Sequence, residues 1–262
     1  MEFTEKALVL RVGRFRENDV WLKLFCAGRG VITAFAFGGS RSRKRFSGCL
    51  DQLVLASFRV GTSRRGSYNV LQEGVLLHAF PGLRASPRKL GLVAHCLKFV
   101  EAVQVDPSSA RPVFDLLLET LATLESGAVG AEMLPLLFKA KLTFEQGLSP
   151  DLTLCVRCGR PVNEHMGWDH VCAEQGAVAV DHHLAFSVER GGLVCSLCGD
   201  VQAEPLCAGS VRVLEWIGKS RPADWPNLAL EPSMRRELGR VVDRFVAWHL
   251  GLRWENGTYR KI

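Results

Sequence analysis

Short runs of alternating apolar and polar residues fill the first 80 positions of the chain. Alternation broken by glycine-rich turns is typical of half-buried β-strands. Five runs fit it, at residues 7–12, 20–26, 31–37, 53–60 and 68–72, with glycines near positions 13, 28–30, 38–39 and 61–66 between them. Five short strands within about 75 residues predict a small closed barrel. An OB-type barrel is the leading interpretation, and an SH3-like barrel is an alternative that periodicity alone does not exclude.

Beyond Pro81 and Pro87 the apolar residues recur every three or four positions instead of every second one. This spacing is typical of amphipathic helices. It predicts three of them, around residues 90–100, 114–124 and 133–142, followed by two more at 211–217 and 234–250. The last carries a broad apolar stripe, which we expect to pack against the earlier helices.

Two Cys-x-x-Cys-Gly sequences lie between the third and fourth predicted helices. Each such turn directs two sulfur atoms toward one point, and four thiolates complete a tetrahedral zinc site with no open position. We therefore predict one structural Zn²⁺ ion, held by Cys155, Cys158, Cys195 and Cys198. A pair of redox dithiols or disulfides is the alternative, which the five other cysteines do not favour because they lack repeated spacings.

The two cysteine pairs are separated by 36 residues, more than in an ordinary zinc ribbon, so we expect an insertion closed at its base by the metal. Four histidines, at 165, 170, 182 and 183, lie within it, but two complete cysteine pairs need no further ligand. The predicted fold class is therefore α+β and multidomain. An OB-fold, DNA-binding barrel over residues 1–80 precedes an α-helical domain over 81–262, with the zinc-binding insertion at about 150–205.

Positive charge is concentrated in the first third of the chain. The whole sequence has 33 Lys or Arg and 27 Asp or Glu, a formal net charge of +6. Residues 1–80 contain 13 of those bases and 6 of those acids, so the remainder is slightly acidic. Such asymmetry indicates a polyanionic partner for the predicted barrel.

A basic loop follows Gly38 and Gly39, where a flexible backbone can track a curved phosphate chain, and arginine donates paired hydrogen bonds to phosphate oxygens. A second basic group near a later turn would border the same groove. The alternative for both is a solvated surface. The predicted DNA-binding residues are Arg41, Arg43, Lys44, Arg45, Arg59, Arg64, Arg65, Arg14 and Arg29.

An OB-type domain that binds single strands without sequence preference also needs exposed rings on which bases stack. Six rings are available in the predicted barrel, although each is more often part of the core in so small a domain: Phe15, Trp21, Phe35, Phe37, Phe46 and Tyr68. Phe46, beside the basic loop, and Tyr68 are the first candidates.

Motifs of catalysis and membrane insertion are absent from the sequence. Gly-Lys-Ser at 218–220 matches the end of a phosphate-binding loop, but Val213 stands where that motif requires glycine. No dinucleotide-binding, metalloprotease or hydrolase motif occurs either. No apolar run approaches the roughly 20 residues of a membrane span, and the first residues do not resemble a signal sequence. We expect a cytoplasmic protein that is not an enzyme.

Four segments, taken in order, resemble the bacterial RecO family of recombination and repair mediators. Residues 9–19, ending Glu-Asn-Asp, match its opening strand and turn, and residues 30–46 match its third strand and basic loop. Residues 147–159 and 186–198 match its cysteine region. The Trp-His-Leu-Gly at 248–251 fits the family's last helix, whereas residues 253–262 do not follow its short basic ending.

The resemblance implies a nucleoid-associated protein that binds single- and double-stranded DNA and anneals complementary strands. It further implies contact with the acidic C-terminal tail of single-strand DNA-binding protein, and loading of RecA recombinase together with RecR. Lys139 and Lys141, which lie near Phe138 and Leu142, are the candidate residues for that tail; the alternative is the solvated face of a helix. Two other functions remain open, namely a nucleic-acid-processing factor built from an OB-fold and a zinc ribbon, and a protein scaffold.

Overall fold

We describe the protein from a computed structural model, over residues 2–42, 44–63, 66–127, 130–162 and 184–262. The chain forms two compact units, Met1–Ala128 and Val129–Ile262. The predicted Arg43, Arg64 and Arg65, and the histidines at 165, 170, 182 and 183, lie outside the described residues. None of the helices in the described ranges is long and apolar enough to cross a membrane.

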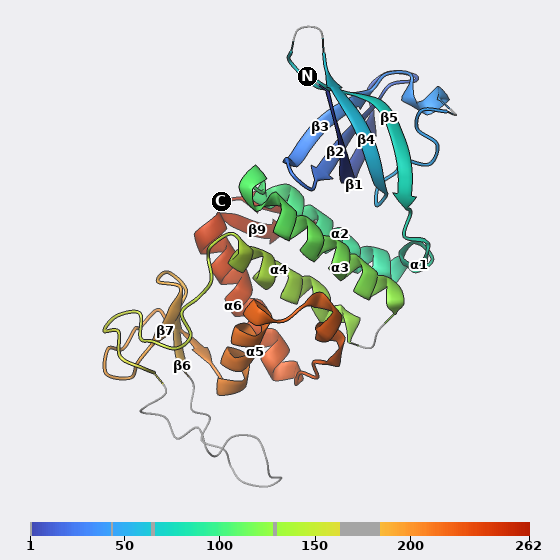
Figure 1. Ribbon diagram of the computed structural model, residues 1–262. Helices are drawn as coiled ribbons and strands as arrows, with labels where there is room; N and C mark the ends of the chain where they lie inside the picture. The colour runs from blue at the N-terminus through green and yellow to red at the C-terminus, as the bar shows by residue number, and fades with distance from the viewer. Residues whose placement is uncertain (1, 43, 64–65, 128–129, 163–183) are drawn as a thin grey trace. The chain divides into compact units, whose positions relative to one another are not determined.

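The first unit begins with a closed five-stranded sheet (Figure 1). Its strands are β1 (Glu2–Arg14), β2 (Val20–Cys26), β3 (Gly30–Ala36), β4 (Leu55–Thr62) and β5 (Asn69–His78). They pair in the order β1-β2-β3-β5-β4, and β4 pairs with β1 to close the ring. All neighbours are antiparallel except β3 and β5, which are parallel. This five-stranded Greek-key arrangement confirms the OB-type prediction over the SH3-like alternative.

The five predicted strands are confirmed, although β1 starts earlier and β5 ends later than the sequence pattern indicates. The first half of β1 pairs with β4, from Glu2 opposite Gly61 to Leu8 opposite Leu55. Its side chains up to Lys6 are exposed or half-buried, so this half has no clear apolar pattern. Residues 2–6 therefore form a strand because their backbone pairs with β4, and not because their side chains are buried.

Buried aliphatic and aromatic side chains fill the interior of the closed sheet. Leu22 and Leu24 of β2 are fully buried, and Phe58 of β4 and Leu71 of β5 are each 1% exposed. Even-numbered residues of β3, Ala34 and Ala36, point into this core. Since successive side chains of a strand face opposite sides, the odd-numbered residues of β3 face outward.

Three helices complete the first unit: α1 (Pro81–Arg84), α2 (Pro87–Val103) and α3 (Ala110–Ser126). Ser86 caps α2 by accepting a hydrogen bond from the Lys89 backbone N–H. On the sheet side, Lys23 of β2 pairs with Glu101 of α2 at 2.9 Å, and the rings of Phe25 and Phe114 lie 5.5 Å apart. These helices therefore belong to the same compact unit as the sheet, while a functional boundary at residue 80 stays a prediction.

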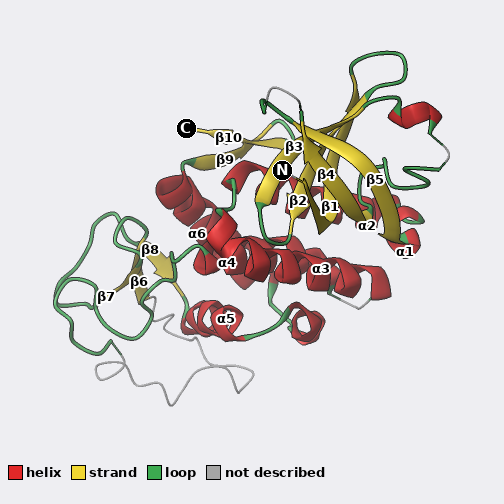
Figure 2. Ribbon diagram, turned by 45° about the horizontal axis from the view of Figure 1, so that its top comes forward, coloured by secondary structure: helices red, strands yellow, loops and turns green. Residues whose placement is uncertain are grey.

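The described residues of the second unit include three α-helices and two small sheets (Figures 1 and 2). The helices are α4 (Leu134–Glu145), α5 (Ala208–Lys219) and α6 (Pro232–Leu250). Between α4 and α5 lie β6 (Leu184–Ser187), β7 (Gly192–Val194) and β8 (Glu204–Leu206), ordered β7-β6-β8. A hairpin of β9 (Leu252–Glu255) and β10 (Thr258–Lys261) follows α6. The predicted helices and the insertion between them are confirmed, and the hairpin is an addition that the pattern did not predict.

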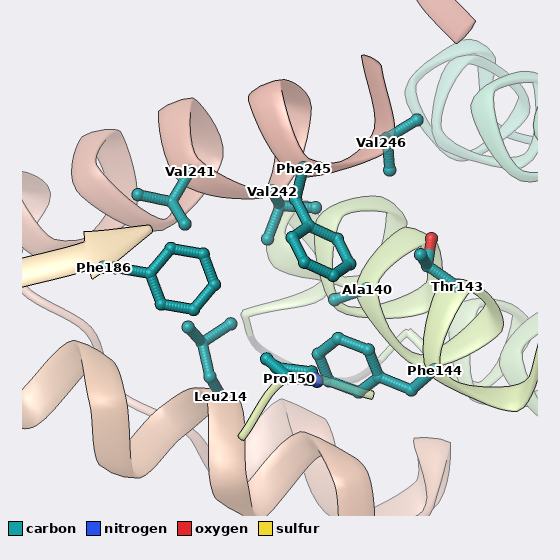
Figure 3. A pocket seen from close by; sticks show the side chains of 10 residues that line it. All are labelled: Ala140, Thr143, Phe144, Pro150, Phe186, Leu214, Val241, Val242, Phe245 and Val246. Atoms are coloured by element: carbon teal, nitrogen blue, oxygen red, sulfur yellow. The ribbon is translucent and has the colours of Figure 1, made fainter. Parts of the chain in front are cut away.

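The apolar stripe of α6 packs against α4 and α5, as expected. Figure 3 shows Val242 and Phe245 of α6 facing Ala140 and Phe144 of α4, with Leu214 of α5 and Phe186 of β6 beside them. The gap among these side chains measures about 10 Å³, room for one water molecule at most. The core of the second unit is thus continuous from the helices to the small sheet beside the second cysteine pair.

Candidate metal centre and nucleic-acid interface

The four predicted ligand sulfurs meet at one point. The Sγ atoms of Cys155, Cys158, Cys195 and Cys198 all lie within 4.8 Å of one another. The Cys158 and Cys195 sulfurs are 3.8 Å apart, and Cys155 and Cys195 are buried. Four sulfurs at such separations can hold a metal ion in tetrahedral coordination.

Each pair of cysteines belongs to a tight turn stabilised by its own backbone. Gly159 N–H donates to the Cys155 carbonyl at 2.8 Å, and Gly199 N–H donates to the Cys195 carbonyl at 3.2 Å. Both glycines have positive φ, 72° and 56°. A side chain would strain these positions, which explains why glycine follows each pair.

The two turns are also joined to each other. The Val156 N–H donates to the Leu193 carbonyl at 2.9 Å, and the Leu193 N–H donates to the Asp151 carbonyl at 3.0 Å. The Arg157 guanidinium reaches from the first turn to the Cys198 carbonyl at 2.9 Å, and also donates to the Gly199 carbonyl. Backbone hydrogen bonds and the Arg157 side chain therefore connect the two turns directly.

Backbone donors favour ionisation at one of the four thiols. Burial opposes the charged form of Cys155, but hydrogen bonds from the amides of Cys195, Arg157 and Cys158 lower its pKa to about 6. The Cys195 N–H lies 3.3 Å from the Cys155 sulfur. Hydrogen bonds with the neighbouring sulfurs of Cys158 and Cys195 raise the pKa of Cys198 to about 12. A bound cation would favour the thiolate form of all four sulfurs.

The predicted basic loop follows β3 and begins with the short helical turn Gly39–Arg41. Asp19 anchors its start by accepting the Gly38 N–H at 2.8 Å. Arg41 is 74% exposed and lies 3.5 Å from the carboxylate of Glu17. Lys44 is exposed and makes no ion pair with any residue in the described ranges.

Arg45, at the end of the same loop, is held against the sheet. Its Nη2 donates to the Phe37 carbonyl at 2.8 Å, and its guanidinium lies 5.0 Å from the centre of the Phe46 ring. The Phe46 ring is only 3% exposed and belongs to the core. The prediction that Phe46 stacks on bases is therefore wrong, because this ring fills the sheet interior.

The remaining described arginines of the predicted set do not all share one face. Arg59 pairs with Glu2 at 3.2 Å, whereas Arg29 pairs with Glu5 at 3.5 Å. Glu2 and Glu5 are three residues apart on β1, so their side chains point to opposite sides of that strand. Arg14 is exposed at the end of β1.

Four aromatic rings gather on the outer side of the closed sheet. Phe35 of β3 lies 5.4 Å from both Phe15 and Tyr68, measured between ring centres. Phe37 lies 6.0 Å from Phe15 and 6.2 Å from Tyr68. Phe15 is 40% exposed and Tyr68 is 43% exposed. We call Phe15, Phe35, Phe37 and Tyr68 the ring cluster.

Positive charge borders the ring cluster. The Arg16 guanidinium lies 5.9 Å from the centre of the Phe15 ring. Arg45 reaches the backbone of Phe37. Nearby on β2, Trp21 pairs in register with Phe35 and has the Arg11 guanidinium 5.8 Å from its ring centre. Periodicity had marked these rings as available, but the outward direction of Phe35 and Phe37 could not be predicted from it.

The predicted partner-binding lysines are both engaged within the second unit. Lys139 is 9% exposed and forms an ion pair with Asp243 of α6. The Lys141 ammonium donates to the Gly218 carbonyl at 2.6 Å and pairs with Glu145 at 3.2 Å. A ligand carboxylate would compete with these contacts.

Comparison with known proteins covers both units. Residues 1–80 match the family model "Recombination protein O N terminal", and residues 84–256 match "Recombination protein O C terminal". The chain is 44% identical to the DNA repair protein RecO of Maridesulfovibrio salexigens over the full length of both proteins. It is 41% identical to that of Nitratidesulfovibrio vulgaris and 34% identical to that of Lawsonia intracellularis, again over full length. The chain therefore belongs to the RecO family, whose role is in DNA repair and recombination.

Proposed function

We propose that this protein is a recombination mediator that binds single-stranded DNA on the outer side of the closed sheet. The ring cluster is the observation that carries this proposal. OB folds bind oligonucleotides on the face of their second and third strands and in the loops before the second and fifth strands. Phe35 lies on β3, Phe15 in the loop before β2, and Tyr68 in the loop before β5, so three of the four rings occupy that binding region.

Stacking and charge would act together at this surface. Bases stack on exposed aromatic rings whatever their identity, at roughly 1–3 kcal/mol per base. Arg16 and Arg45, at the edge of the ring cluster, are placed to contact phosphates, and Arg41, Lys44 and Arg14 would extend the path. Arg29 and Arg59 stay predictions of weaker effect, since each pairs with a glutamate and is less exposed than Arg16 and Arg41. Arg16 and Arg41 also have carboxylate partners, but their own side chains are largely in solvent.

Annealing follows from the same surface without a bond-breaking step. Basic side chains lower the repulsion between two phosphate backbones, and rings that hold single strands unpaired leave their base edges open to a complement. We infer from family membership that double-stranded DNA binding, work with RecR and the indirect loading of RecA accompany this activity.

The binding test compares Phe15→Ala/Tyr68→Ala with the parent by fluorescence anisotropy of a labelled thymidine oligonucleotide. We expect the affinity to fall roughly 30-fold or more, since two stacking contacts of at least about 1 kcal/mol each are lost. Val75→Ala/Leu77→Ala is the matched control, because these exposed side chains lie at the other end of β5. Equal affinity of the ring variant and the control would reject the proposed surface.

We also propose that the four cysteines bind one Zn²⁺ ion with a structural role. A tetrahedron with Zn–S bonds of about 2.3 Å has edges of about 3.8 Å, and the Cys158–Cys195 sulfur separation is 3.8 Å. When bound, the ion supplies charge neutralisation for four thiolates and no open coordination position. Release of one zinc per chain into a chromogenic chelator after denaturation would support this, and a stoichiometry near zero in the freshly purified protein would reject it.

Binding of the acidic tail of single-strand DNA-binding protein at Lys139 and Lys141 stays a proposal from family membership. Lys141→Gln tests this site better than replacement of both lysines by glutamate. A carboxylate at position 139 would face Asp243 and disturb the packing of α4 against α6. Weaker binding of a tail peptide to this variant than to the parent is the expected result. Unchanged binding would show that the tail peptide does not bind at Lys141.

A further inference from the structure

The hairpin after α6 is a rigid element that the family model does not fully cover. The match ends at residue 256, so β10 lies beyond it. Asn256 and Gly257 both have positive φ, 49° and 76°, as in the type I′ turn that suits two-residue hairpins. Trp254 and Tyr259 face each other across the strands with ring centres 4.9 Å apart. Cross-strand aromatic pairs stabilise such hairpins.

One face of this hairpin carries an arrangement of charge that costs stability. Arg253 of β9 lies directly opposite Arg260 of β10 in the strand register. Like charges at directly opposed positions are destabilising. Glu255 offsets part of this repulsion from 3.7 Å, where it reaches only Arg253. Lys261 follows Arg260 and is also exposed, on the opposite face at the end of the hairpin. A rigid element that concentrates like charges is suited to a ligand of opposite charge.

An exposed aromatic side chain lies a few residues before these charges in the sequence. Trp248, on the last turn of α6, is 59% exposed. Gly251 ends that helix with φ 61°, and its carbonyl accepts the Ile262 N–H at 2.9 Å. The end of β10 is therefore fixed beside the end of α6. Basic side chains together with an exposed indole match the chemistry of a nucleic-acid strand, which offers both phosphates and bases.

We propose that the hairpin, through Arg253, Arg260, Lys261 and Trp248, is a second binding site for single-stranded DNA in this chain. The inference rests on the proposed function and extends it. With one contact on the closed sheet and another in the second unit, one molecule binds two strands at once. Annealing then becomes a reaction between two bound strands, whose effective concentration exceeds that in solution.

The test counts short oligonucleotides bound per chain. Thymidine decamers cannot pair with each other, so their binding reports protein sites alone. Titration at low salt, followed by sedimentation of the complexes, should give two decamers per chain for the parent and one for Arg253→Gln/Arg260→Gln/Lys261→Gln. Loss of two or three phosphate contacts should weaken the second binding step roughly 30-fold or more, and annealing of longer complementary strands should slow to a similar extent.

Two matched variants make the outcome decisive. Lys219→Gln/Arg236→Gln removes exposed bases from helices of the same unit and should still bind two decamers. Trp248→Ala removes the ring but keeps the charges, and should weaken only the second step. A parent that binds one decamer, or a hairpin variant that still binds two, would overturn the second site while leaving the closed-sheet site intact. A parent protein that binds no decamer would instead reject the proposed function itself.

Discussion

The closed sheet and the cysteine module are two small β structures stabilised by different means. The closed sheet encloses large side chains, such as Phe58 and Leu24, that are fully or almost fully buried. The module has three strands of three or four residues, shares an apolar core with the helices of the second unit through Phe186, and gathers four sulfurs at one point. A sheet with a sufficient interior can leave rings on its outer face, whereas we propose that the cysteine module needs a bound metal as well as its apolar contacts to stay folded.

The largest expected effect tests whether a metal stabilises the cysteine module. Cys195→Ser should abolish metal binding and unfold the module, because structural zinc supplies on the order of 10 kcal/mol to folding of such sites. Hydrogen exchange should show lost protection in β6 to β8 and retained protection in β1 to β5.

Cys207→Ser is the matched control for this experiment. Its thiol caps α5 by accepting the Ser210 N–H, a role that serine also performs. This variant should keep its zinc. A Cys195→Ser protein whose module remains protected would contradict the view that metal maintains this region.

The second prediction tests whether the closed sheet is stabilised by its buried side chains. Leu24→Ala in β2 should lower the free energy of unfolding of the first unit by about 2–5 kcal/mol, since it opens a cavity in a closed interior. Leu76→Ala, at a side chain 41% exposed, should cost far less. Chemical denaturation measures both, and zinc content should stay unchanged. Loss of zinc in Leu24→Ala would show that the two regions do not fold independently.

A third prediction refines the account of the cysteine module. Arg157→Ala removes the hydrogen bonds between the first turn and the carbonyls of the second, and should weaken zinc retention roughly 10- to 100-fold against a chelator. Arg160→Ala is the control, because only the backbone carbonyl of Arg160 contacts Cys155. Equal retention in the two variants would show that Arg157 has no part in holding the turns together.

The smallest predicted effect concerns charge on the closed sheet. Arg41→Ala/Lys44→Ala/Arg45→Ala should reduce the slope of log affinity against log salt by up to about 2, since each phosphate contact on a single strand contributes about 0.7. Arg29→Ala/Arg59→Ala should change the slope less, because both arginines are less exposed than Arg41, although all three have a glutamate partner. The opposite ranking would contradict the placement of phosphates along the loop that carries Arg41, Lys44 and Arg45.

Spacing and periodicity were enough to predict the five strands of the closed sheet, the five longer helices and the cysteine cluster. A Cys-x-x-Cys-Gly turn fixes its own geometry locally, and two such turns have few other ways to satisfy four thiols. The amphipathic stripe of α6 likewise follows from positions within one helix. These features depend on neighbours in sequence, and the sequence therefore predicts them.

Which side of a strand faces the core could not be predicted in the same way. Residues 34–37 alternate alanine and phenylalanine, and an alternating pattern does not say which set is buried. Burial of large rings is the default expectation, yet the alanines face the interior and the rings face outward. Phe46 is the converse case, since it leaves a polar loop to fill the core.

The partners of the charged side chains could not be predicted from the sequence either. The partners of Lys139 and Arg59 are Asp243 and Glu2, each far away in the chain. Without the fold, every exposed base in a cluster has equal weight as a phosphate ligand. The closed sheet therefore narrows the predicted basic set by showing which members already have carboxylate partners.

Photo-crosslinking is the most direct test of the central claim that single-stranded DNA lies on the outer face of the closed sheet. The full-length protein would be irradiated with an oligonucleotide containing 5-iodouracil, and the adducts mapped by mass spectrometry. The account predicts adducts at Phe15 or Tyr68, which disappear when those residues are replaced by alanine. Adducts confined to residues 84–262 would contradict it.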